Sequence, residues 1–232
     1  MFYTDQVAKT GLQYDEGLRK FMLDVYNQMM VALAISGLFA FGVSMNQVAM
    51  QIIWQTPLKW VVMFAPLAMS LAFVFMADKM SLFMTRIYLF TFAAVMGLSM
   101  SAIFMIFKFS GIVNAFFVTA ATFGAASIYG YTTKRDLTSM GSFLMMGVFG
   151  LIIAGVVNLF LQSSMMAFVV SCLSVLIFTG LTAYDTQRLR EVYDELQDEE
   201  MEKAGVFGAL NLYINFINIF LSLLQILGDK KE

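Results

Sequence analysis

The chain has 232 residues, of which 60% are hydrophobic and 13% are charged, and its net charge is −2. Soluble domains carry about 25% charged residues, so this composition excludes a soluble protein and indicates a single integral membrane domain. The single cysteine excludes an internal disulfide bond. The lack of histidine removes the commonest ligand of zinc, so no metal or other cofactor is expected.

The first 28 residues are expected to form a cytoplasmic tail and an interfacial helix. Charged residues are scattered through this segment, and it contains no recognisable cleavable signal sequence, so we expect it to be retained. Near its end, apolar residues recur at helical spacing beside charged ones: Leu18, Phe21, Met22, Val25 and Met29. This pattern predicts an amphipathic helix that lies in the membrane interface.

Seven apolar runs follow, each with about the 20 residues needed to cross ~30 Å of hydrocarbon. They lie near residues 29–46, 58–77, 84–107, 112–132, 141–161, 165–185 and 206–227. These runs predict an all-α protein with a seven-helix membrane domain over residues 29–228 and a short C-terminal tail at 229–232. Pro66 lies within the second run and is expected to kink its helix.

The basic residues favour a cytoplasmic N-terminus. That orientation puts ten of them inside, namely Lys9, Arg19, Lys20, Lys79, Arg86, Lys134, Arg135, Arg188, Arg190 and Lys203. It leaves four outside: Lys59, Lys108, Lys230 and Lys231. Cytoplasmic loops are enriched in basic residues. Whether the last run crosses fully stays open, because two of the outside lysines follow it.

A polar stripe runs along the last apolar segment. Its members are spaced three or four residues apart, which places them on one helix face: Asn211, Asn215, Asn218, Ser222 and Gln225. Unpaired amides in hydrocarbon cost several kcal/mol, so this face is expected to meet other helices or water inside the bundle. Either the amides form interhelical hydrogen bonds or they line a permeation path.

The sixth run carries a matching face, which ends in the one carboxylate at membrane depth. The face consists of Ser171, Ser174, Phe178, Thr182 and Asp185. Ionisable groups within a membrane are candidates for function, and we expect the two polar faces to meet. The alternative for Asp185 is an ion pair with Arg188, three residues further along the same helix.

Other patterns indicate packing rather than chemistry. The twenty methionines are scattered and favour apolar packing over copper binding. Small residues at four-residue spacing predict close helix contacts: Ala120, Gly124, Ala126 and Gly130, and also Gly150 and Ala154. No phosphate-binding glycine loop or Ser/His/Asp set is present, so we expect neither an enzyme nor a nucleic-acid partner.

Several stretches, taken in order, resemble the Bax inhibitor family, also called the transmembrane Bax inhibitor motif family, in its bacterial form. They are Gly17–Arg19, Val25–Asn27, Thr119–Gly124, Gly130–Leu137, Val157–Phe160, Leu181–Gln187 and Gly208–Asn218. The resemblance implies a seven-helix bundle with the seventh helix at its centre, in the bacterial inner membrane. It also implies a pH-sensitive calcium leak, with calcium as the permeant ion.

The resemblance further implies a sensor made of two aspartates, in the sixth and seventh helices, assisted by a basic residue near the end of the second. Asp185 matches the first aspartate and Lys79 lies near the basic position, but Asn215 stands at the second aspartate. Gln225 likewise stands where the family usually has a basic residue. Two adjacent carboxylates repel each other and hold a proton near neutral pH. An Asp–Asn pair does not, so we expect an ionised Asp185 and weakened proton gating and calcium affinity.

Two functions therefore compete. The first is a cation leak in which the polar faces line the path. The second is a regulatory protein that is embedded in the lipid bilayer and modulates other membrane proteins, such as a membrane-anchored protease. It would bind them through its cytoplasmic termini and loops. In the second case the polar stripe would be structural only.

Overall fold

The computed structural model describes the backbone of residues 2–196 and 198–231, with all side chains in these ranges except those of 2–15, 74, 78 and 198. The described chain is helical throughout, apart from its connections and one isolated β-bridge. The helices are α1 (Phe2–Met45), α2 (Gln47–Trp54), α3 (Leu58–Met76), η1 (Ala77–Lys79), α4 (Leu82–Met100), α5 (Ile103–Ile106), α6 (Phe109–Thr132), α7 (Thr138–Leu161), α8 (Ser164–Glu195) and α9 (Asp198–Leu227). The predicted all-α class is confirmed.

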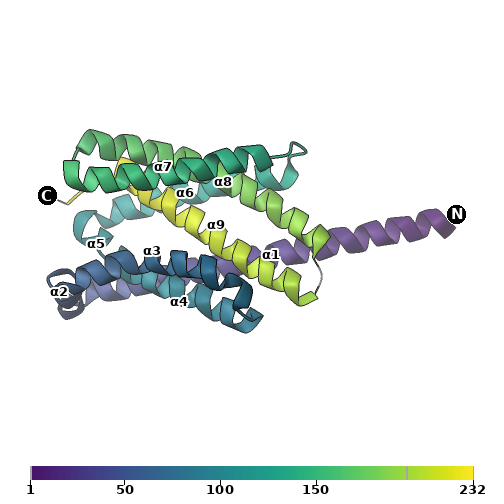
Figure 1. The fold of residues 1–232 in the computed structure, drawn as a ribbon, viewed down its shortest axis with the longest axis horizontal. Coiled ribbons are helices and arrows are strands. Elements are labelled where there is room, and N and C mark those ends of the chain that lie inside the picture. Colours follow the sequence, from purple (N-terminus) through teal and green to yellow (C-terminus); the bar gives the residue numbers. More distant parts are fainter. Residues whose placement is uncertain (1, 197, 232) are drawn as a thin grey trace.

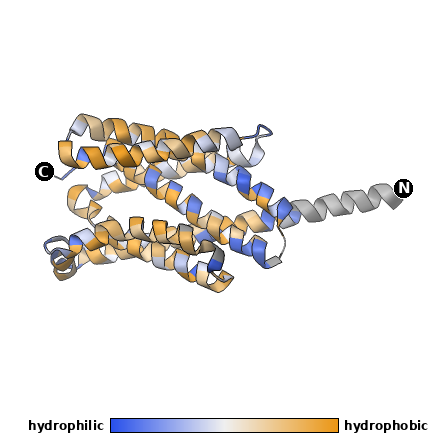
Figure 2. Cartoon of the chain, viewed as in Figure 1, coloured by the Kyte–Doolittle hydropathy of each residue, from blue (hydrophilic) through white to orange (hydrophobic). Residues whose placement is uncertain are grey.

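Six helical segments in the described chain are long and apolar enough to cross a membrane. A seventh crossing results if α2 and α3, which meet at a bend of 80°, are counted as one span. Hydrophobic positions predominate along the middle of the bundle, whereas hydrophilic positions gather where α8 ends and α9 begins and recur along α9 (Figure 2). The protein is therefore a multi-pass membrane protein.

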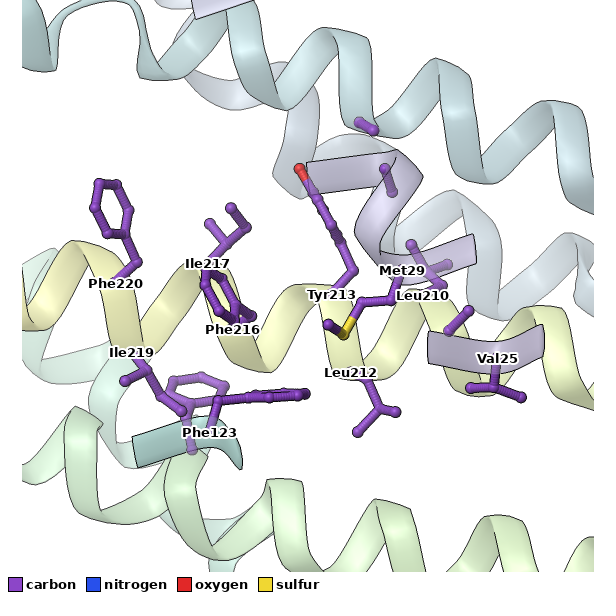
Figure 3. Close-up of a cluster of buried hydrophobic side chains, with 14 of the residues drawn as sticks. Val25, Met29, Phe123, Leu210, Leu212, Tyr213, Phe216, Ile217, Ile219 and Phe220 are labelled. Atoms are coloured by element: carbon purple, nitrogen blue, oxygen red, sulfur yellow. The ribbon is translucent and has the colours of Figure 1, made fainter. Parts of the chain in front are cut away.

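Helix α9 packs against α8, α1, α6 and α4 (Figure 1). In its most apolar stretch 61% of the residues are buried, against 39% in α6 and 0% in α7. Its side chains point in several directions into the core, where Phe216 and Ile219 lie near Phe123 of α6, and Tyr213 lies near Met29 of α1 (Figure 3). The helix with the polar stripe thus also supplies a larger share of the apolar core than any other described helix.

Helix α1 contains the predicted amphipathic segment and continues from it into the first apolar run. It runs without a break from Phe2 to Met45. The residues predicted to lie in the membrane interface are at most 8% exposed and belong to the core of the bundle: Leu18, Phe21, Met22, Val25 and Met29. A helix that packs on other helices and a helix that lies on lipid need the same apolar stripe. The spacing alone therefore could not show that this stripe packs on the bundle.

The connections separate cleanly between the two ends of the bundle. The α3–α4, α6–α7 and α8–α9 connections lie at the end where α1 enters, whereas α2, α5 and the C-terminus lie at the other end (Figure 1). Helix α9 therefore runs from one end to the other. At the far end, the backbone N–H of Lys108 donates to the carbonyl of Asp229 (2.7 Å), and that of Lys231 donates to the carbonyl of Ile106 (2.8 Å). Lys9 is one of the ten basic residues that were predicted to lie on the cytoplasmic side, and its side chain lies outside the described residues.

One break within a predicted span and one short helix were not predicted. The run at 84–107 is divided into α4 and α5, and Ser101 lies at the break, where its hydroxyl accepts a hydrogen bond from the indole N–H of Trp54 (3.0 Å). The short helix α2 lies across the end of the bundle before the chain turns into α3. Pro66 is accommodated within α3, which continues to Met76.

Candidate functional site

The candidate site lies between α8 and α9, where the amide Nδ2 of Asn215 donates a hydrogen bond to Oδ2 of Asp185 at 2.6 Å. Asn215 is buried, with 4% of its surface exposed, and Asp185 is half-buried. A hydrogen bond to an ionised carboxylate is shorter and stronger than one between neutral groups. The amide can therefore hold Asp185 as an anion, and it has no carboxyl proton of its own to exchange.

The same two helices meet again about two turns deeper in the bundle. The hydroxyl of Ser222 bonds that of Ser174 at 2.8 Å, and both residues are buried. Between these two contacts, Thr182 is fully buried and its hydroxyl donates to the carbonyl of Phe178 on its own helix (2.7 Å). Ser171 is also buried, so the predicted polar face of α8 is turned inward along its length.

The stripe on α9 is only partly covered. Asn211 and Gln225, at its two ends, are exposed. Asn218 is half-buried and donates to the carbonyl of Ile214 on its own helix (2.8 Å). Among the described residues, Asn215 and Ser222 are the members of the stripe that form side-chain hydrogen bonds to α8.

Neither of the two basic residues predicted near Asp185 forms an ion pair with it in the described part of the chain. Lys79 is exposed on η1, and within the described part of the chain no hydrogen bond or ion pair joins it to Asp185. Arg188 is also exposed and forms no ion pair with Asp185 in the same part of the chain. Asp185 is therefore paired with an amide instead of a cation.

Over residues 18–232 the chain matches the family described as inhibitor of apoptosis-promoting Bax1. It belongs to this family. An uncharacterised protein of Rickettsia prowazekii is 40% identical over 233 residues, covering 99% of both chains. One of Caulobacter vibrioides is 41% identical over 235 residues, covering 97% of this chain and 94% of the relative. Inner membrane protein YbhL of Escherichia coli is 35% identical over 219 residues, covering 93% and 94%. The predicted resemblance is confirmed.

This Bax inhibitor family protein has a second polar contact beside Asp185 that the sequence did not predict. The side chain of Gln187 is buried and holds the α6–α7 loop at two points. Its Oε1 accepts the backbone N–H of Leu137 (2.8 Å), and its Nε2 donates to the carbonyl of Arg135 (2.9 Å). Arg190 donates to the carbonyl of Tyr131 (2.9 Å) at the end of α6. In the sequence, the only signal for these loop contacts was a glutamine and an arginine placed just after an apolar run.

Asp136 shapes the same loop from the solvent side. Its Oδ1 accepts the backbone N–H of Thr138 at 2.8 Å, at the start of α7. Hydrogen bonds from the hydroxyl and backbone amide of Thr138 lower the pKa of Asp136, because they favour the charged form. The charged carboxylate thus accepts the first backbone N–H of α7 at neutral pH.

A third polar contact ties α1 and α4 to α9. The hydroxyl of Ser36 lies 2.6 Å from that of Tyr213 and donates toward the carbonyl of Ala93 (2.7 Å). Both side chains are buried, Tyr213 completely. A tyrosine in an apolar helix gave no sequence signal that distinguished this role from packing.

The site holds few groups that could coordinate a metal ion. Across the described residues, no three His, Cys, Asp or Glu side chains gather in a way that could hold one. What the α8–α9 interface offers instead is one carboxylate, its amide partner and a series of hydroxyls between two helices.

Proposed function

We propose that this Bax inhibitor family protein is a calcium leak channel of the bacterial inner membrane, with α8 and α9 beside the permeation path. The observation that carries the proposal is the hydrogen bond from Asn215 to Asp185, which places a carboxylate between the two helices that meet near the bundle interior. Carboxylates within membrane spans are costly and usually serve an ion or proton path. Calcium prefers oxygen ligands, which this interface provides.

In the proposed topology α2 and α3 form one crossing, the bundle has seven spans, and α9 is central. The N-terminus is cytoplasmic, because the connections at its end carry most of the basic residues. Placement in the inner membrane follows the relative YbhL of Escherichia coli, which is an inner membrane protein.

The proposed gating differs from that of a pair of carboxylates. Two carboxylates in contact share one proton and separate when both ionise, so their contact depends on pH. An amide does not ionise, so the contact between Asp185 and Asn215 persists wherever Asp185 is charged. The leak should therefore be low and should vary little across neutral pH.

Calcium flux into liposomes that contain only the purified protein tests this proposal. We expect the native chain to show a small flux with little change from pH 6 to 8. Asn215→Asp should introduce a several-fold pH dependence, because the new carboxylate faces Asp185 directly. The matched control is Asn218→Asp, which adds a carboxylate one turn further along α9, where the native amide bonds its own helix.

A steep pH response in the native chain that is lost in Asp185→Asn would contradict the claim that Asn215 weakens the sensor. Equal responses in Asn215→Asp and Asn218→Asp would contradict the assignment of the contact as the sensor. Flux in neither the native chain nor Asn215→Asp would favour the alternative, a regulator of other membrane proteins, because a binding protein has no reason to conduct.

A further inference from the structure

An open groove runs along the bundle between α1 and α6, and neither Asp185 nor Asn215 lines it. It encloses about 1200 Å³ and has Phe216 of α9 among its lining residues. Pockets for small molecules measure about 300–1,000 Å³, so the groove is large for a metabolite. Along α1 its lining extends from Arg19 to Gly37, which is about 27 Å at 1.5 Å per residue. A ligand that fills it must be long and thin.

The walls of the groove suit a flexible apolar chain. On α1 they include Met22, Met29 and Met30, whose unbranched side chains adapt to irregular shapes. Two glycines, Gly37 and Gly124, lie on opposite walls, and a Cβ added at either would meet nothing within 4 Å. The groove therefore has real free width between α1 and α6.

Positive charge is confined to one end of the groove. Arg19 is exposed and is the one charged residue among the described residues that line it. At the same end, the lining residue Tyr131 accepts a hydrogen bond from the guanidinium of Arg190 through its carbonyl (2.9 Å). Tyrosine and arginine are typical of the depth at which lipid headgroups lie.

One polar group on the wall has no partner within the protein. The hydroxyl of Ser127 is buried, with the residue 7% exposed, and forms no hydrogen bond among the described residues. Ser127 lines the groove one helical turn from Tyr131. A buried hydroxyl without a partner is costly, and a rotation about its side chain would let it donate to an acceptor in the groove.

We propose that the groove binds an anionic phospholipid, with its phosphate at Arg19, an ester carbonyl near Ser127 and its acyl chains along the methionines and glycines. Charge at one end and apolar walls beyond match an amphiphile. A second copy of the chain would fit poorly, because copies inserted in the same orientation place both Arg19 side chains at the same depth in a two-fold interface. Like charges so placed repel each other.

Native mass spectrometry of the full chain tests the proposal. The protein is equilibrated with equal amounts of phosphatidylglycerol and phosphatidylcholine in detergent, and the lipids that remain bound are counted. We expect phosphatidylglycerol to be retained about fivefold over phosphatidylcholine, the factor for one basic residue near an anionic headgroup. Arg19→Gln should bring the two lipids to parity. The neighbouring Lys20, which is exposed but does not line the groove, gives the matched control Lys20→Gln.

A second variant tests the acyl-chain part independently of charge. Gly124→Leu projects a side chain into open space and should displace both lipids, while the helical content and thermal stability stay at native values. Equal retention of the two lipids by the native chain, or unchanged selectivity in Arg19→Gln, would overturn the proposal. A loss of dimers instead of lipids in Gly124→Leu would assign the groove to a second copy of the chain.

Discussion

Helix α6 packs differently along its two faces, although both carry small residues. Toward α8 the helices nearly touch: a Cβ at Gly130 would overlap the carbonyl oxygen of Ala183 and lie 2.9 Å from its Cα. Toward α1 they stay apart, and a Cβ at Gly124 would meet nothing within 4 Å. The first face closes an interface between helices, and the second forms a wall of the groove.

The difference shows what close backbone approach contributes in this fold. Where α6 meets α8, the contact at Gly130 lets Gln187 and Arg190 reach backbone groups around the end of α6. These hydrogen bonds give partners to backbone groups at the membrane boundary that would otherwise need water, and an unpaired backbone group there is costly. Where α6 faces α1, the residues between them are mostly apolar, and the space is left for another molecule.

The strongest test of the comparison is to add a methyl group on the closed face. Gly130→Ala places its Cβ against the backbone of Ala183, which cannot move unless α6 and α8 separate. Overpacking of this kind costs about 1–3 kcal/mol, and occasionally more. We expect a clear loss of thermal stability in detergent, and a larger one for Gly130→Val. Native stability in both variants would show that the two helices are not in close contact.

The next test removes the polar bonds of the closed face without changing its volume. Gln187→Leu leaves the N–H of Leu137 and the carbonyl of Arg135 without their partner, at about 1–3 kcal/mol for each group that stays buried. We expect destabilisation and faster hydrogen exchange at the Leu137 amide. Gln187→Glu is the matched control, since it keeps the acceptor for Leu137 and should protect that amide. Equal exchange in the two variants would contradict the assigned bond.

Periodicity and run length were enough to locate six candidate spans, because each crossing needs about 20 apolar residues whatever surrounds it. The run at 58–77 counts as a crossing only if α2 and α3 form one bent span. The same argument placed the polar face of α8 inward, since Thr182 and Ser174 fall on one side of the helix. It could not separate Gly124 from Gly130. Small residues at helical spacing permit a close contact, but the neighbouring helix decides whether one forms.

What local patterns could not determine has a common physical origin. The stripe from Leu18 to Met29 packs on the bundle because α9 supplies an apolar partner that no local pattern reveals. Lys79 was expected near Asp185 by resemblance alone; it is exposed on η1, and its part in a sensor stays a prediction. Gln187 and Tyr213 were missed because their partners come from α6–α7 and α1, far away in the sequence.

The smallest expected effect, opposite in sign, is on the open face. Gly124→Ala adds a methyl group where nothing lies within 4 Å, so it meets no steric cost. Alanine in a helix interior is favoured over glycine by about 0.5–1 kcal/mol, because glycine loses more backbone freedom on folding. We therefore expect a slight rise in thermal stability, measured beside Gly130→Ala in the same detergent. Should Gly124→Ala destabilise the protein as Gly130→Ala does, the space between α1 and α6 would be closed, and the contrast between the two faces of α6 would be lost.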